Sequence, residues 1–341
     1  MTLESVWLAL LGLLLGGYFV LGGYDYGVQM LALRPGGEKA GHEKAGQRDT
    51  VSAMAPFFLG NEVWLVAFVG VLFGAFPHLE GHLLSGLYPV FAALVLGLVL
   101  GGAAVQLRGR ARGAGAHRVW SALLVLGGAL PALCWGLVLG LLTRGVPRRA
   151  DGSFHIGPDE VLHPYVLACG LAAVLLFAAH GATFLALRGG PELADGARRT
   201  ARTLLRATLA AAVLPALLTL AGAGAALRHP GTASVLLALL LAALAATRWL
   251  LAGRGTPGRA FAVSCCAALL PVPLLGAGQY PYVLAARGGG GITVGEAAAD
   301  EVTLRTLLAF GVVLVPVILA YQAWNWWVFR GRTGLRHPRY F

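Results

Sequence analysis

Three polar side chains interrupt apolar stretches of this sequence and could carry chemistry inside a membrane. Asp25 lies in the stretch 6–26, and Asn61 and Glu62 lie together near the start of the stretch 57–77. An acidic side chain at membrane depth costs roughly 2.5–3.5 kcal/mol on insertion scales, so it normally faces a protein interior or a wet path. Because a carboxyl group can take up and release a proton, Asp25, Glu62 and Asn61 are candidates for a proton path.

Two other interpretations of these acids stay open at this point. Each acid could simply hold neighbouring helices together through hydrogen bonds. Glu62, which lies close to the start of its stretch, could instead reach back to water at the membrane surface.

The histidine and cysteine patterns indicate a cofactor or metal site less strongly than the acids indicate a proton path. His180 lies inside the stretch 165–187 and is a candidate haem ligand by residue type, but no second histidine is placed to pair with it. His78, Glu80 and His82 share one short turn without a fourth ligand, so we predict no metal site there. The four cysteines form neither a CxxC nor a haem-attachment CxxCH pattern.

No nucleotide-binding motif and no catalytic Ser/His or Cys/His pattern occurs in the sequence. The chain by itself therefore offers no catalytic centre. This absence is typical of a supporting subunit whose cofactors belong to a partner.

The composition predicts an all-α polytopic membrane protein, because 57% of the 341 residues are hydrophobic and only 12% are charged. A membrane crossing needs about 20 apolar residues, and the sequence offers nine such stretches. They are centred on 6–26, 57–77, 84–105, 119–142, 165–187, 204–227, 233–252, 260–280 and 306–328. We interpret 1–341 as one membrane domain, with helix bundles over 1–142 and 165–280 and a last helix over 306–328.

The basic residues collect in alternate connections and thereby predict the topology. One side receives Arg34, Lys39, Lys44, Arg48, Arg108, Arg110, Arg112, Arg118, Arg188, Arg198, Arg199, Arg202, Arg254, Arg259, Arg330, Arg332, Arg336 and Arg339; the other receives Arg144, Arg148, Arg149, Arg228 and Arg287. The positive-inside rule then places the N-terminus outside and the C-terminus in the cytoplasm. It also explains the net charge of +11 without a nucleic-acid partner.

Six short segments, in order along the chain, together resemble one known family. They are Gly23–Gly27 (GYDYG), Gly60–Leu65 (GNEVWL), Phe76-Pro77, Ser85–Tyr88 (SGLY), Gly181–Leu185 (GATFL) and Pro316–Arg332 (PVILAYQAWNWWVFRGR). This pattern is similar to subunit II of the cytochrome bd-type quinol oxidases.

The resemblance implies a multi-pass protein of a bacterial plasma membrane that serves in aerobic respiration. It would be a subunit of a terminal oxidase that oxidises quinol and reduces oxygen to water. It implies that haems b and d and the quinol-oxidising loop belong to the partner, subunit I. This chain would support that partner, line a cytoplasmic proton path, contact lipid, hold a structural quinone between its helices and meet a small accessory subunit.

One residue that the resemblance points to would lie at the partner interface. Helices in lipid associate by close packing, so a face containing Trp64 is expected to contact subunit I. Two rival interpretations are a small-molecule transporter with a site at the proline-containing sixth and eighth stretches, and a paralogue that assembles without supporting turnover.

The sequence departs from the family pattern at two positions. Leu59 stands where the family usually has aspartate, two residues before Asn61, and Gly22 stands where some members have another aspartate. Because leucine carries no proton, a proton path through this chain would depend on Asp25.

Overall fold

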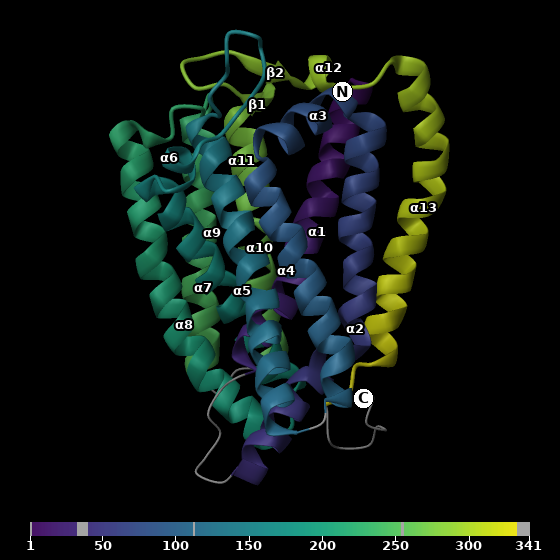
Figure 1. Cartoon of the computed structure of the whole chain (residues 1–341), viewed down its shortest axis with the longest axis vertical. Helices are drawn as coiled ribbons and strands as arrows, with labels where there is room; N and C mark the ends of the chain where they lie inside the picture. The colour runs from purple at the N-terminus through teal and green to yellow at the C-terminus, as the bar shows by residue number, and fades with distance from the viewer. Residues whose placement is uncertain (1, 33–39, 112, 254–255, 333–341) are drawn as a thin grey trace.

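The computed structural model describes residues 2–32, 40–111, 113–253 and 256–332, and within them the chain forms a bundle of long helices (Figure 1). The long helices are α1 (Leu3–Leu31), α2 (Ala40–Ala75), α4 (Tyr88–Leu107), α5 (Ala114–Arg144), α7 (Pro164–Arg188), α8 (Pro191–Leu218), α9 (Pro230–Ala252), α10 (Pro257–Leu269) followed by α11 (Pro271–Gln279), and α13 (Glu301–Val328). The described residues contain nine spans long and apolar enough to cross a membrane, which confirms the predicted all-α polytopic class.

Short elements cap the end of the bundle at which α1 begins. They are α3 (Pro77–Gly86), α6 (Pro158–Val161), the strands β1 (Tyr282–Ala285) and β2 (Gly291–Thr293), and α12 (Val294–Ala297). The two strands pair antiparallel. Glu160 of α6 forms a salt bridge of 2.8 Å with Arg287, which ties the 145–163 connection to the segment after β1.

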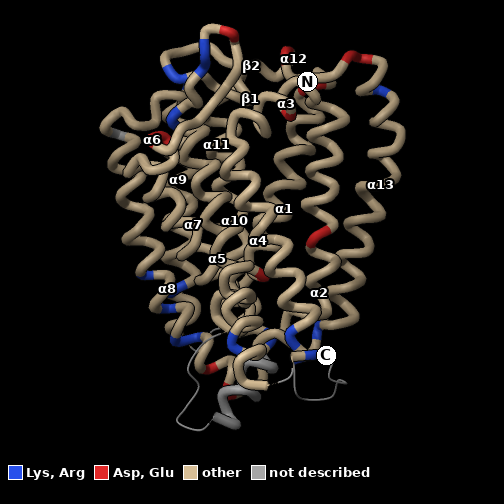
Figure 2. Tube along the Cα trace, in the orientation of Figure 1, with Lys and Arg blue, Asp and Glu red and all other residues tan. Residues whose placement is uncertain are grey.

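α1 begins at one end of the bundle and α13 ends at the other, as an odd number of spans requires (Figure 1). Most Lys and Arg positions lie at the end where α13 finishes (Figure 2). Arg34, Lys39, Arg112, Arg254, Arg336 and Arg339, which contribute to the predicted topology, lie outside the described residues.

The sixth span differs from its predicted position of 204–227, because α8 runs from Pro191 to Leu218. Proline is favoured in the first turn of a helix, where its missing N–H is not needed. The arginines that follow can extend toward the membrane surface while their carbon stems stay in apolar surroundings. The helical stretch ends in a kink at Gly222, whose φ of 97° is a conformation that glycine adopts readily.

Close approach of glycines sets the crossing of α1 and α7. A Cβ atom on Gly27 would lie against the carbonyl oxygen of Phe177 and 2.7 Å from the Cα of Gly181. Small residues of this kind allow membrane helices to pack backbone to backbone. Two of the segments that carry the family resemblance, around Asp25 and around Gly181, therefore meet at this crossing.

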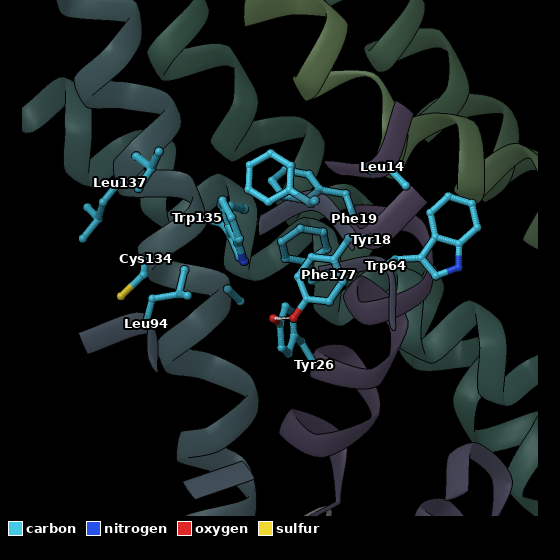
Figure 3. Close-up of a cluster of buried hydrophobic side chains, with 14 of the residues drawn as sticks. Leu14, Tyr18, Phe19, Tyr26, Trp64, Leu94, Cys134, Trp135, Leu137 and Phe177 are labelled. Atoms are coloured by element: carbon cyan, nitrogen blue, oxygen red, sulfur yellow. Dashed lines mark hydrogen bonds between the residues drawn. The ribbon is translucent and has the colours of Figure 1, made fainter. Parts of the chain in front are cut away.

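Aromatic side chains fill the core beside α1. The hydroxyl groups of Tyr18 and Tyr26 are hydrogen-bonded to each other, and the ring of Trp135 lies next to them (Figure 3). Both tyrosines are buried. Tyr18 and Tyr26 are eight residues apart, a net rotation of about 80° around α1, and both point into the bundle.

Candidate functional site

Asp25 and Asn61 meet in the interior, between α1 and α2. The Nδ2 of Asn61 donates to Oδ2 of Asp25 at 2.8 Å and to the hydroxyl of Tyr24 at 2.7 Å. Asp25 is 1% exposed and Asn61 is fully buried. A hydrogen bond between an amide and a carboxyl oxygen is worth more where water is absent, so this contact fixes both helices at the depth of Asp25.

The last helix completes the site. Gln322 of α13 donates through Nε2 to Oδ1 of Asn61 at 3.2 Å. One turn further along α13, Nδ2 of Asn325 approaches the carbonyl oxygen of Pro56 at 3.5 Å. We call Tyr24, Asp25, Asn61 and Gln322 the polar cluster; it joins the first two helices of the chain to the last.

Two oxygen atoms of the polar cluster have no hydrogen-bond donor among the described residues. They are Oδ1 of Asp25 and Oε1 of Gln322, and both are buried. Buried acceptors normally have a partner, because leaving one unpaired costs about 1–3 kcal/mol. These two acceptors are therefore the atoms of the cluster that a proton or a hydrogen-bond donor from outside the described residues would engage.

Aromatic rings surround Tyr24 and shield one side of the polar cluster. The Tyr24 ring stacks on Phe184 with centroids 4.2 Å apart, and Trp326 meets it edge-on. Nearby, the guanidinium of Arg188 lies 5.1 Å from the centre of the Phe57 ring, and Arg188 is only 6% exposed. These side chains enclose the Tyr24 ring, which has no surface open to water on its side of the polar cluster.

Glu62 and Leu59 do not join the polar cluster. Glu62 is only partly buried and forms no hydrogen bond with the rest of the described chain. Leu59 is 68% exposed and lies on the outer face of α2. Consecutive residues of a helix point about 100° apart, which explains why Asn61 reaches Asp25 while its neighbour Glu62 does not.

Trp64 packs inside this chain. Its indole ring lies against Gly17 of α1, where a side chain larger than hydrogen would collide with the ring, and Trp64 is 7% exposed. Trp64 therefore contacts α1 of this chain. Any effect of Trp64 on the interface with subunit I would be indirect, because Trp64 sets how α2 packs against α1.

His180 is buried and both of its ring nitrogens face protein groups. Nδ1 lies 2.8 Å from the hydroxyl of Ser264, and Nε2 lies 2.9 Å from the carbonyl oxygen of Val20. A carbonyl oxygen only accepts, so Nε2 carries a hydrogen. Because iron binds a ring nitrogen through its free lone pair, this arrangement does not fit haem ligation.

The histidines of the short turn after α2 lie on α3. Nδ1 of His78 contacts the carbonyl oxygen of Glu296 at 3.1 Å. Over the described ranges, no group of three or more His, Cys, Asp or Glu side chains is arranged to hold a metal ion.

Sequence reasoning missed the contribution of α13 to the site. The three tryptophans near its end predict an aromatic belt at the membrane surface. Trp324 and Trp327 are 59% and 62% exposed, whereas Trp326 packs against the buried rings of Tyr24 and Phe57. Gln322 and Asn325, however, are buried. Their spacing of three residues puts two amides on one face of an apolar helix, and that spacing is the signal that could have revealed them.

The chain matches a described family and several characterised proteins along nearly its whole length. The family described as "Cytochrome bd terminal oxidase subunit II" matches residues 3–329. The chain is 26% identical to cytochrome bd ubiquinol oxidase subunit 2 of Bacillus subtilis (strain 168), over 99% of this chain and 98% of that protein. It is 27% identical to cytochrome bd-I ubiquinol oxidase subunit 2 of Escherichia coli (strain K12), over 97% and 95% respectively.

The fold is also similar to that of a solved structure. A chain of the bd oxidase from Geobacillus thermodenitrificans superposes with a TM-score of 0.74 at 19% sequence identity, covering 96% of this chain and 99% of that one.

Proposed function

Because the chain belongs to the cytochrome bd terminal oxidase subunit II family, we propose that it carries protons from the cytoplasmic side toward the oxygen-reducing centre of such an oxidase, with Asp25 as the group that takes up and releases them. The family is that of a quinol oxidase of the bacterial membrane, which works as a complex with subunit I and contains haem. Neither a transporter nor a non-catalytic paralogue is favoured by these relatives.

One observation carries the proposal for Asp25. Its carboxyl group is buried in a membrane span, yet only one of its two oxygens accepts a hydrogen bond from the described residues. A carboxyl that served only to join helices would be expected to use both oxygens, because unpaired buried acceptors are costly. Asp25 is six residues from the end of α1, a rise of about 9 Å, so a short chain of water could connect it with the basic end of the bundle.

Asn61, Tyr24 and Gln322 hold the proton-carrying group in place. Asn61 fixes one carboxyl oxygen and is itself fixed by Gln322, which leaves the second oxygen free to exchange a proton. Glu62, on the same helix as Asn61, has a secondary role in this proposal, because it is partly exposed and forms no hydrogen bond with the polar cluster among the described residues.

The haems, in this proposal, are ligated by subunit I. They would supply the electron transfer from quinol to oxygen, and this chain would supply packing and protons. The hydrogen bonds of His180 support this division, because both ring nitrogens are already engaged.

A structural quinone held by this chain would fit an apolar cavity between its later helices. The cavity has a volume of about 550 Å³ and lies between α5, α7, α8, α9 and α11. Tyr165 and Thr219, which are hydrogen-bonded to each other at 3.0 Å, line it together with Thr143. The apolar walls suit an isoprenoid tail. The Thr143 and Thr219 hydroxyls already donate to the carbonyl oxygens of Leu139 and Pro215, so a quinone carbonyl would take the Tyr165 hydroxyl hydrogen in place of Thr219.

Co-purification followed by an absorbance spectrum tests the proposed division of labour. An affinity tag on this chain should recover a second membrane subunit together with haem absorbance, and His180→Gln should leave the haem content per complex unchanged. A strong Soret band from this chain purified without subunit I, or loss of one haem in His180→Gln, would place a haem ligand here and overturn the proposal.

A further inference from the structure

Two arginines on neighbouring spans have no hydrogen-bond or salt-bridge partner among the described residues. Arg202 of α8 and Arg248 of α9 are partly exposed, but the Nε atom of each is buried without a hydrogen-bond acceptor. Neither forms a salt bridge within the described residues. A guanidinium group has five N–H donors and stays charged. Because each Nε is enclosed by the chain, an acceptor from outside the described chain would meet the Nη groups.

A third arginine shows that the two groups lie at the same depth. Arg198 of α8 donates through Nε to the carbonyl oxygen of Leu251 at 2.7 Å and through Nη2 to that of Gly253, at the end of α9. Arg202 lies one turn further along α8, and Arg248 lies nearly one turn before Leu251 on α9. Arg202 is therefore about 6 Å and Arg248 about 4.5 Å deeper than this contact, on helices whose axes are expected to be roughly 8–10 Å apart.

The surrounding charges are unbalanced. The described sequences of α7, α9 and α10 contain no Asp or Glu, and the acids of α8, Glu192 and Asp195, lie at its beginning, at least seven residues before Arg202. α2 also contacts α8, and its first acids, Glu43 and Asp49, lie in the part of that helix whose side chains are not described. Basic positions continue along the lower part of α8 (Figure 2), where Arg199 and Arg206 are exposed. The outer surface of α8 at this depth is therefore strongly positive.

Deeper in the membrane than these arginines, the exposed surface of α8 and α9 is apolar. Trp249, next to Arg248, is 73% exposed, which is typical of an indole at the boundary between head groups and acyl chains. Deeper in the membrane, Val213 and Leu217 of α8 and Leu239 of α9 are 46%, 57% and 51% exposed. A ligand that fits both features has an anionic head and a hydrocarbon body.

We propose that Arg202 and Arg248 form a binding site for the phosphate group of an anionic phospholipid in the leaflet at the basic end of the bundle. The phosphate oxygens accept from the two guanidinium groups, which suit phosphate because they present several donors in one plane. The acyl chains lie along the exposed apolar surface of α8 and α9. The site is independent of the polar cluster and of the proton path proposed above.

Native mass spectrometry of the purified, delipidated complex tests this site. Phosphatidylglycerol and phosphatidylcholine would be added separately to the natural protein, to Arg202→Gln/Arg248→Gln, and to Arg206→Gln as a matched control, since Arg206 is an exposed arginine one turn from Arg202. A basic residue near a membrane surface contributes roughly 1 kcal/mol toward anionic lipid, so the double variant should bind phosphatidylglycerol about 30-fold more weakly. Arg206→Gln should lose several-fold less.

Two further measurements distinguish loss of charge from misfolding, and a lipid site from a site for free phosphate. Arg202→Lys/Arg248→Lys keeps both charges and should retain most of the preference for phosphatidylglycerol, which distinguishes a lost site from a misfolded double variant. Equal binding of both lipids to the natural protein would overturn the proposal, as would unchanged phosphatidylglycerol binding in the double Gln variant. Displacement of the lipid by millimolar inorganic phosphate would show a site for the free anion and would overturn it as well.

Discussion

Asp25→Asn removes the proton-carrying oxygen of the polar cluster while keeping its shape. The new amide still offers one oxygen to Nδ2 of Asn61, which now lies 2.8 Å from the carboxyl. Exchanging a hydrogen bond to a carboxylate for one to a neutral amide changes stability by about 1 kcal/mol. The complex should therefore assemble with its haem spectrum intact.

The same change should strongly reduce turnover. Removing a positioned proton-transfer group typically costs about 10²–10⁴-fold in rate, so we expect at least a 100-fold loss of quinol-dependent oxygen consumption. An oxygen electrode with purified complex and excess quinol measures this rate, normalised to haem content. The loss exceeds what a 1 kcal/mol change in stability could cause, because almost all of the protein would remain folded.

Two comparison variants separate chemistry from packing. Glu62→Gln should reduce turnover less than Asp25→Asn, because Glu62 is partly exposed and forms no hydrogen bond within the described chain. Asp25→Ala also leaves Asn61 without its carboxyl acceptor and should lower assembly as well as turnover. Full oxidase activity in Asp25→Asn would refute the reasoning, since it would mean that Asp25 is structural and that protons arrive through subunit I.

Three other expectations follow from the same structure. Leu59→Asp should not raise turnover through this chain, because Leu59 is 68% exposed and faces away from Asp25; a clear gain would mean that the partner completes a path at that surface. Trp64→Ala should lower recovery of the complex, because truncating a buried tryptophan typically costs about 3–5 kcal/mol; unchanged assembly and haem content would make its packing on α1 dispensable. In a background without the native cysteines, a membrane-impermeant thiol reagent added from outside should label Asp159→Cys and spare Gly109→Cys, as the distribution of basic residues predicts; the reverse pattern would invert the topology.

The sequence determined the class of the protein and the number of its spans. Both follow from local properties, since a span requires only enough consecutive apolar residues to cross the hydrocarbon layer. Length and hydropathy were less able to locate the ends of α8, because Pro191 can open a helix whose first turns are rich in arginine. The importance of the segments around Asp25 and Asn61 was also predictable, because polar groups are costly within an apolar span and usually serve a function there.

Only the tertiary structure decided which of these groups form one site. Asn61 and Glu62 are adjacent in the sequence, but the rotation of about 100° between them sends the amide to Asp25 and leaves the carboxyl outside the cluster. Gln322 reaches Asn61 across 261 positions of the chain, a contact that depends on how α13 packs on α2. Helix packing of this kind is set by the fit of whole faces, and no local pattern in the sequence records it.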